Sequence, residues 1–278
     1  MHSYLDLVRF EHTLFALPFA YAGMLVAAGG WPGWATFGWI TVAMVGARTA
    51  AMALNRLIDA RLDALNPRTA GRELPKGVLG RVDALVLAFI GFALLALAGW
   101  ALNPLTLALL PVAVAALTLY SYTKRISWLC HLWLGATIGA AAAGGWIGVT
   151  GSFSAGAVCL WLGVALWIAG FDVIYGMLDF EFDREHRIQS IPARFGLKRA
   201  VTISGVMHGL AVAALLLLVP LTRMGVVYLA AVALVAAVLL RSHLLVRTRG
   251  AGVALAAFNA NLYVSSLVLA GVVLDLLL

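Results

Sequence analysis

Residues 55–63 read NRLIDARLD, and residues 175–183 read YGMLDFEFD. Each stretch ends in the pattern Asp-x-x-x-Asp and lies at the end of a long apolar run. On a helix this spacing places both carboxylates on one face, where they repel each other unless a cation or a ligand lies between them. The four carboxylates are Asp59, Asp63, Asp179 and Asp183. Because a bare pair of this kind is a poor structural element, the two stretches indicate a binding site.

The chain around these stretches has the composition of a membrane protein. Of its 278 residues, 63% are hydrophobic and 11% are charged, and the mean hydropathy is +1.00, which excludes a soluble globular domain. One crossing of the bilayer needs about 20 apolar residues, so the length predicts an all-α, polytopic membrane protein with about nine transmembrane helices. The predicted spans are 13–30, 35–58, 83–102, 104–123, 131–149, 156–180, 200–221, 225–243 and 252–275.

The charged residues predict how the chain lies in the membrane. Lys and Arg number 19 against 12 Asp and Glu, which gives a net charge of +7. Nearly all of these cations follow the even-numbered spans, whereas the connections on the other side contain only Arg223. Under the positive-inside rule, the N-terminus and the carboxylate stretches face the cytoplasm, across the cell (inner or plasma) membrane. The basic excess is thus a topology signal, and we expect no nucleic-acid partner.

The two carboxylate stretches also indicate an internal repeat. Asp59 and Asp179 are 120 positions apart, each stretch ends an even-numbered span, and each is followed by a basic loop that contains Pro and Gly. We interpret this as two four-helix halves, at about 1–123 and 124–250, followed by a ninth helix at about 252–275. A single transmembrane domain over 1–278 would then hold the two stretches across a central cavity that opens toward the cytoplasm.

Further polar residues extend both stretches into the membrane. Arg48 and Asn55 share a helical face with the first carboxylate pair, at a turn of about 100° per residue. Asp172 lies seven residues before the second pair, hence roughly 10 Å deeper at about 1.5 Å per residue. Ionisable groups at such a depth are costly and usually line a cavity that holds water or substrate.

Carboxylates that face cations at a membrane surface suit one kind of chemistry. Mg²⁺ takes oxygen ligands and is typically held by one or two carboxylates together with the phosphate oxygens of a substrate. The four carboxylates are therefore candidate metal ligands that place two Mg²⁺ ions against a diphosphate, which improves diphosphate as a leaving group. The cations expected to neutralise the remaining charge are Arg68, Arg72, Lys124 and Arg194. The apolar spans would house a long hydrocarbon tail.

At these residues the sequence resembles the UbiA superfamily of intramembrane prenyltransferases. The segment from Asn55 to Asp63 is similar to the first Asp-rich motif of that family, and the segment from Asp179 to Asp183 is similar to the second. Further signatures in the expected order are Tyr120-x-x-x-Lys124, Arg68-Thr69-Ala70-x-Arg72-x-Leu74-Pro75 and Asp172-x-Ile174-Tyr175. The resemblance runs from about Arg9 to Gly196.

The resemblance implies nine helices around a central cavity and Mg²⁺-dependent transfer of a prenyl group from polyprenyl diphosphate to an acceptor. It is greatest for the 4-hydroxybenzoate polyprenyltransferase-like branch of quinone biosynthesis, so the expected partners are polyprenyl diphosphate, an aromatic acceptor and membrane lipid. Candidate catalytic residues are Asp172 as the base that deprotonates the acceptor, with Arg72 and Lys124. Candidate residues for binding diphosphate or acceptor are Arg48, Asn55, Arg68, Arg72, Tyr120, Lys124, Tyr175, Arg194 and His12.

Two departures from the family pattern leave the acceptor open. Arg56 stands where the family usually has Asp, and Leu178 stands where Gln often precedes the second motif. The alternatives are a prenyltransferase for another acceptor, of futalosine-pathway, ether-lipid, haem or chlorophyll type, and a secondary transporter, which also combines repeats with intramembrane charges. Arg125 is interpreted as a positive-inside anchor. The histidines given no role are His131, His186, His208 and His243.

Overall fold

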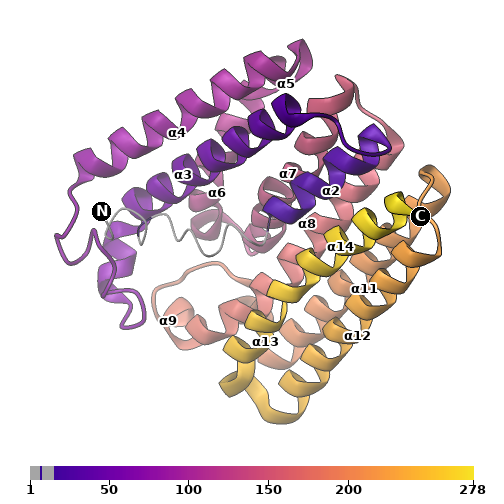
Figure 1. The fold of residues 1–278 in the computed structure, drawn as a ribbon. Helices are drawn as coiled ribbons and strands as arrows, with labels where there is room; N and C mark the ends of the chain where they lie inside the picture. The colour runs from indigo at the N-terminus through magenta and orange to yellow at the C-terminus, as the bar shows by residue number, and fades with distance from the viewer. Residues whose placement is uncertain (1–6, 8–15) are drawn as a thin grey trace.

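A computed structural model describes Leu7 and residues 16–278, and within these residues every regular element is a helix (Figure 1). The α-helices are α2 (Leu17–Ala28), α3 (Trp34–Leu65), α4 (Arg81–Leu102), α5 (Pro104–Ala108), α6 (Leu110–Ile126), α7 (Cys130–Thr150), α8 (Ala155–Gly176), α9 (Phe180–Glu185), α10 (Ile191–Phe195), α11 (Leu197–Leu221), α12 (Val226–Arg249), α13 (Ala254–Ala260) and α14 (Leu262–Leu277). Two 3-10 helices are η2 (Met177–Asp179) and η3 (Gly250–Val253).

The apolar segments form helices of the length that a membrane requires. In the described part of the chain, six helical stretches are long and apolar enough to cross a bilayer, and α2 is a shorter apolar helix. The six stretches are Trp34–Leu65, Arg81–Leu102, Cys130–Thr150, Ala155–Glu185, Leu197–Leu221 and Val226–Leu277. The predicted all-α membrane fold is confirmed, whereas the number of nine crossings stays a prediction.

Small residues let the central helices approach closely. A Cβ on Gly46 of α3 would come 2.6 Å from the carbonyl oxygen of Gly91 in α4, and a Cβ on Gly139 of α7 would come 2.8 Å from the backbone nitrogen of Ala165 in α8. Membrane helices associate through such contacts because lipid provides no hydrophobic driving force between them. The second and third helices of each predicted half also lie side by side, α3 with α4 and α8 with α11 (Figure 1).

Three predicted spans are interrupted. The span 104–123 was expected as one helix, but it divides into α5 and α6 near Pro111, whose ring cannot continue a preceding helix. The span 252–275 divides at Asn261, whose side chain accepts a hydrogen bond from Trp167 Nε1 at 2.9 Å. The span 156–180 ends earlier than expected, because α8 stops at Gly176 and η2 follows.

The last interruption corrects one expectation about the site. The second carboxylate pair was expected on a continuous α-helix, but Asp179 ends the 3-10 helix η2 and Asp183 belongs to α9. The break occurs where α8 meets α7, since a Cβ on Gly176 would lie 3.2 Å from Cε1 of His131. A tighter 3-10 turn inside a long helix often marks a functional position.

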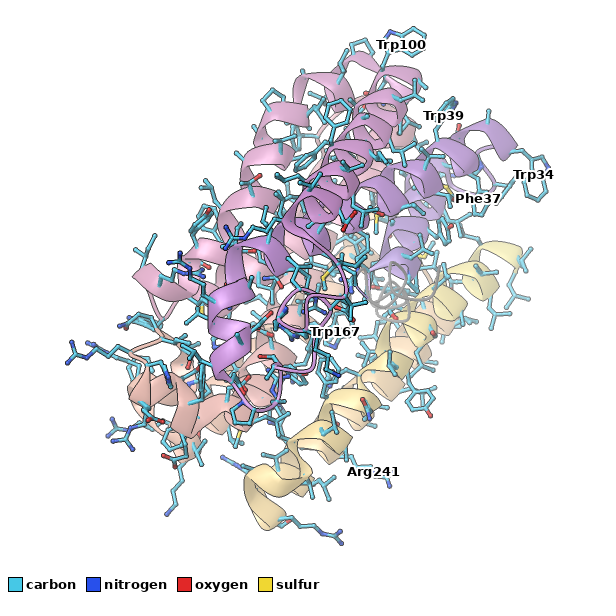
Figure 2. All side chains as sticks on the ribbon, turned by 90° about the vertical axis from the view of Figure 1, so that its left-hand side faces the viewer. Trp34, Phe37, Trp39, Trp100, Trp167 and Arg241 are labelled. Atoms are coloured by element: carbon cyan, nitrogen blue, oxygen red, sulfur yellow. The ribbon has the colours of Figure 1, made fainter. Side chains whose placement is uncertain are left out.

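The two ends of the bundle carry different side chains. Trp34, Phe37, Trp39 and Trp100 project at one end, and Arg241 projects at the opposite end (Figure 2). The Trp31 and Trp34 rings pack edge to face, with centroids 4.8 Å apart. Tryptophan is typical of membrane interfaces, where its amphipathic ring sits at the level of the lipid headgroups. The aromatic end is thus one membrane interface, and the carboxylate stretches lie toward the other.

Candidate active site

One cavity contacts both carboxylate stretches. Its volume is about 820 Å³, and it is lined mostly by apolar side chains, which is typical of a site for a small molecule. The carboxylates that line it are Asp59, Asp63, Asp172, Asp179 and Asp183. Of the polar stripe on α3, the cavity is also lined by Arg48 and Asn55. The structure thus brings the two stretches to one cavity, as the sequence predicts.

Asp59 lies at the centre of a buried ionic cluster. Its side chain is 1% exposed, and Lys124 Nζ donates to Oδ2 at 2.6 Å while Arg125 Nη2 donates to Oδ1 at 2.9 Å. Asn55 Nδ2 also donates to Oδ2, at 2.9 Å. Because two cations from α6 converge on one carboxylate of α3, this cluster ties the two helices together and carries a net positive charge.

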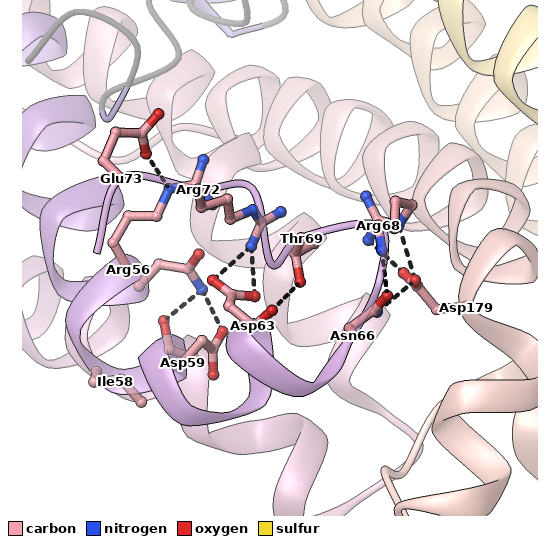
Figure 3. A network of polar contacts seen from close by, with 12 residues as sticks. Arg56, Ile58, Asp59, Asp63, Asn66, Arg68, Thr69, Arg72, Glu73 and Asp179 are labelled. Atoms are coloured by element: carbon pink, nitrogen blue, oxygen red, sulfur yellow. Dashed lines mark hydrogen bonds and ion pairs between the residues drawn. The ribbon is translucent and has the colours of Figure 1, made fainter. Parts of the chain in front are cut away.

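Asp63 is held by the loop that follows α3. The helix ends at Leu65 because Asn66 precedes Pro67, and helical geometry is disfavoured for a residue before proline. Asn66 is extended. The chain then turns back, and Arg72 Nη1 donates to both oxygens of Asp63, at 2.7 and 2.8 Å (Figure 3). The Asp near the helix end and the basic loop that follows it thus form a local ion pair.

The same loop reaches the second carboxylate stretch. Arg68 Nε and Asn66 Nδ2 both donate to Asp179 Oδ1, at 2.8 and 2.9 Å (Figure 3). Arg68 Nη1 donates to the Tyr175 hydroxyl at 2.8 Å, and its guanidinium lies 5.1 Å from the centre of that ring. Burial lowers the pKa of Arg68, but the hydrogen bond and charge of Asp179, helped by charges from Tyr175 and Asp63, raise it above its usual value. The guanidinium therefore stays charged.

Asp183 and Asp172 have neutral or imidazole partners. Ser190 Oγ donates to Asp183 Oδ2 at 2.8 Å, and the Asp183 residue is 8% exposed. Asp172, near the C-terminal end of α8, lies with Oδ2 2.6 Å from His131 Nδ1. These two carboxylates contrast with the three whose charges are balanced by Arg or Lys.

Of the remaining predicted site residues, some line the cavity and others do not. Tyr120 and Tyr175 line the cavity, and the Tyr120 hydroxyl donates to the carbonyl of Ala51 at 3.2 Å. Arg194, on the short helix α10, is exposed and does not line the cavity, so its predicted diphosphate contact finds no support in this geometry. His12 lies outside the described residues.

The residue that departs from the family pattern at position 56 is buried. Arg56 is 2% exposed and lines the cavity, and its Nε lies 4.0 Å from Oε2 of Glu73 (Figure 3). Glu73 belongs to the loop that carries Arg68 and Arg72. Arg56 thus connects α3 to that loop, and its charge faces the loop carboxylate as well as the cavity.

Four residues of the site were missed or given another role in the sequence analysis. Arg125, interpreted as a topology anchor, contacts Asp59, and His131, given no role, contacts Asp172. Asn66 and Ser190 were given no role at the site, although each supplies a hydrogen bond to a carboxylate of the second stretch. The position of Asn66 before Pro67 was an available signal for a turn at this place. Nothing in the local sequence pairs Ser190 with Asp183.

The donor set fits Mg²⁺ that is shared with a substrate. In the described part of the chain, no group of three or more His, Cys, Asp or Glu side chains is placed to hold a metal ion by itself. The carboxylates that line the cavity offer hard oxygen donors from both stretches. Mg²⁺ is commonly held by one or two carboxylates and completed by substrate phosphate oxygens and water, so the fit requires a phosphate-bearing ligand.

Comparison with known proteins decides the family. Residues 16–274 match the sequence model of the UbiA prenyltransferase family. The chain belongs to this family. As a UbiA-family protein it is a prenyltransferase and an integral membrane protein. The transporter interpretation is thereby set aside.

Relatives and solved structures agree with this assignment over nearly the whole chain. The 4-hydroxybenzoate octaprenyltransferase of Aeromonas hydrophila is 30% identical over 282 residues, which cover 99% of this chain and 96% of the relative. The enzyme of the same name from Alkalilimnicola ehrlichii is 29% identical over 258 residues, which cover 91% and 86%. The apo structure of a UbiA homolog from Aeropyrum pernix K1 is 36% identical, with a TM-score of 0.87 and coverage of 95% and 98%.

A second solved structure supports the fold alone. It is a UbiA homolog from Archaeoglobus fulgidus bound to DMAPP and Mg²⁺, with a TM-score of 0.71, 17% identity and coverage of 96% and 99%. That UbiA homolog therefore shares its helical arrangement with the present chain. DMAPP and Mg²⁺ are ligands of that homolog.

Proposed function

We propose that the protein is a Mg²⁺-dependent aromatic prenyltransferase that moves a prenyl group from polyprenyl diphosphate to an acceptor such as 4-hydroxybenzoate, in ubiquinone or menaquinone biosynthesis. The observation that carries this proposal is the position of both carboxylate stretches, with their cations, at one end of an otherwise apolar cavity. The names of the curated relatives support 4-hydroxybenzoate as the acceptor. A futalosine-pathway aromatic, an ether lipid and a haem-type or chlorophyll-type acceptor remain the alternatives.

The cavity is long enough for a prenyl tail. Its lining follows α3 from Ile40 to Asp63, a distance of about 35 Å at about 1.5 Å per residue, which is close to the thickness of the hydrocarbon core. At the end remote from the carboxylates most lining residues are apolar or aromatic, and they include Leu102, Ile147 and Phe153. The tail thus extends from the polar end along the membrane-spanning helices.

The diphosphate binds at the polar end in this proposal. Mg²⁺ held by Asp59, Asp63, Asp179 and Asp183 would polarise the diphosphate and improve it as a leaving group. Arg68, Arg72 and Lys124 exchange their contacts with the carboxylates for charge-assisted hydrogen bonds to the phosphate oxygens. Release of diphosphate leaves an allylic cation beside Tyr175 and Phe258, whose rings are 4.5 Å apart and whose faces attract positive charge.

The acceptor ring attacks that cation from the membrane side of the carboxylates. Asp172 lines the cavity there and is the proposed base for the acceptor hydroxyl. For the topology we retain one domain over 1–278, with halves at about 1–123 and 124–250 and a ninth helix at about 252–275. The polar end then faces the cytoplasm, from which both a soluble aromatic acid and Mg²⁺ are supplied.

A direct assay tests the proposed function. Purified protein in detergent is incubated with geranyl diphosphate and 4-hydroxybenzoate, with either Mg²⁺ or EDTA, and both free diphosphate and the aromatic product are measured, the latter by mass spectrometry. We expect geranylated 4-hydroxybenzoate with Mg²⁺ and none with EDTA, because the four carboxylates need a metal to engage the diphosphate. Mg²⁺-dependent diphosphate release without this product would reject the benzoate acceptor. Product formation in EDTA would reject the metal mechanism.

The tail region of the cavity gives a further prediction. Gly144 of α7 lines the cavity, and a Cβ built on it meets nothing within 4 Å, so a side chain there would occupy the space of the tail. We expect Gly144→Phe to lower kcat/KM for octaprenyl diphosphate by about tenfold, because the phenyl ring and the long tail would compete for the same space, and such overpacking costs about 1–3 kcal/mol. For geranyl diphosphate, whose tail is shorter, we expect a decrease of about twofold or less. Competing turnover of the two substrates measures the ratio.

A matched substitution separates this effect from a general one. Gly209 of α11 is also helical, and a Cβ there likewise meets nothing within 4 Å, but it does not line the cavity. Gly209→Phe should leave the ratio of the two prenyl substrates unchanged. An equal loss of both substrates in Gly144→Phe would show that the tail does not pass this position.

A further inference from the structure

Asp172 and His131 form a dyad in the wall of the cavity, and the metal and diphosphate chemistry does not use it. Asp172 Oδ2 and His131 Nδ1 are 2.6 Å apart. The Asp172 side chain is 24% exposed and the His131 side chain is 6% exposed, and both residues line the cavity. The carboxylate is therefore the member of the pair that a ligand reaches, and the imidazole lies behind it.

The imidazole is held in place by α8 itself. A Cβ on Gly176 would lie 3.2 Å from Cε1 of His131, so the ring occupies space that the absent side chain leaves open. The preceding residue, Cys130, donates through Sγ to the carbonyl of Gln189 at 3.2 Å and thereby fixes the start of α7. The ring orientation that presents Nδ1 to Asp172 is thus determined by packing as well as by the hydrogen bond.

The second ring nitrogen of His131 reduces the stability of the fold. His131 Nε2 is buried and has no hydrogen-bond partner among the described residues. A buried polar atom without a partner costs about 1–3 kcal/mol, and a residue selected for packing alone would avoid that cost. In enzymes, a catalytic base is often oriented by a hydrogen bond from a neighbouring side chain. The buried His131 imidazole is placed to orient the Asp172 carboxylate in this way.

We infer that His131 is a positioning residue that holds the Asp172 carboxylate toward the acceptor hydroxyl. This inference rests on the proposed function. In the reaction, the hydroxyl proton passes to Asp172 while the ring carbon forms a bond to C1 of the prenyl group, and the C–O bond to diphosphate breaks with its electron pair leaving on diphosphate. Loss of the proton from the alkylated ring carbon then restores the aromatic ring, and the hydroxyl regains its proton. The net products are prenylated acceptor, diphosphate and one proton.

The test compares two substitutions of His131. His131→Asn keeps an N–H donor near the place of Nδ1, whereas His131→Leu keeps an apolar volume and removes the donor. We expect His131→Leu to lower kcat for 4-hydroxybenzoate by about 30-fold or more, which is part of the 10²–10⁴-fold that a general base typically contributes. His131→Asn should recover at least a third of the wild-type kcat. The KM for geranyl diphosphate should stay within about twofold in both variants, because neither residue contacts the diphosphate end.

A double substitution distinguishes positioning from a merely structural role. If His131 acts through Asp172, then His131→Leu combined with Asp172→Asn should be no slower than Asp172→Asn alone. Multiplied losses, or a His131→Leu variant with full kcat, would overturn the inference. Equal losses in the Leu and Asn variants, accompanied by a lower melting temperature, would also overturn it and assign His131 a packing role. Failure of the proposed function would differ, since the unaltered protein would then give no prenylated product.

Discussion

The combined substitution Asp59→Asn and Asp183→Asn abolishes Mg²⁺-dependent prenyl transfer in a protein that remains folded: this is the largest change in activity that we expect. Asn has the shape of Asp and retains one acceptor oxygen, so Ser190 keeps its hydrogen-bond partner at position 183, and one of the two cations, Lys124 or Arg125, keeps an acceptor at position 59. The negative charges, one from each stretch, are lost. We expect a decrease in turnover of roughly 10³-fold or more, because single electrostatic contributors to a transition state are typically worth 10²–10³.

The measurement is diphosphate release and product formation at saturating Mg²⁺, together with the melting temperature in detergent. Glu181→Gln is the matched control, since Glu181 lies between Asp179 and Asp183 in the chain but is exposed and does not line the cavity. It should keep full activity. More than about a tenth of wild-type turnover in the double variant would contradict the two-stretch mechanism, because metal ligands are not dispensable to that extent.

A second variant guards against loss of folding. Two cations contact Asp59, so neutralising it leaves buried positive charge, which costs about 3–5 kcal/mol when a partner is removed entirely. Among the described side chains, the Asp183 carboxylate has a hydrogen bond from the Ser190 hydroxyl, at 2.8 Å, and no ion pair, so Asp183→Asn alone breaks no ion pair there. This single variant should fold normally and still lose at least about 10²-fold in turnover.

The largest expected effect on stability comes from Gly145→Leu. Gly145 of α7 packs against the backbone of α2, and a Cβ there would contact the carbonyl group of Ala20, with its carbon atom at 2.9 Å. A backbone carbonyl cannot move away as a flexible side chain can, so α2 would have to separate from α7. We expect a loss of about 3 kcal/mol or more, hence a melting temperature lower by roughly 10 °C, or no folded protein.

The neighbouring glycine provides the control. A Cβ on Gly144 meets nothing within 4 Å, so Gly144→Leu adds the same side chain one position away without a collision. Its melting temperature should stay within about 3 °C of the unaltered protein, as is usual for substitutions that break no packing. Thermal unfolding in detergent, followed by size-exclusion chromatography, measures both variants. Equal melting temperatures would show that α2 and α7 are not in close backbone contact.

The sequence predicted those parts of the site that depend on local periodicity. Asn55, Asp59 and Asp63 lie on one face of a helix whose pattern is regular over many residues, and the structure places all three at the cavity. The hydropathy of the spans likewise predicted the all-α membrane fold. Both signals are intrinsic to a single helix, so neither needs knowledge of what packs against it.

The contacts between distant segments were beyond this reasoning. Arg125 reaches Asp59 and Asn66 reaches Asp179 only because α6 and η2 are brought beside the end of α3. The charge of Arg125 alone does not distinguish it from a topology anchor. The end of α8 at Gly176 was missed for the same reason, since the ring that requires a glycine there comes from α7. Arg194 is a basic residue in the expected loop that does not line the cavity, and its local sequence does not distinguish it from the loop cations that do.

The pairing of Arg68, Arg72 and Lys124 with the carboxylates has a thermodynamic consequence for ligand binding. In the absence of ligands the two sets of charges satisfy each other, so neither a divalent cation nor a diphosphate gains its full interaction by entering alone. A cation that takes the carboxylates frees the guanidinium and ammonium groups for an anion, and an anion that takes those groups frees the carboxylates. The proposed metal and substrate are therefore linked ligands, and each must raise the affinity of the site for the other by the same factor.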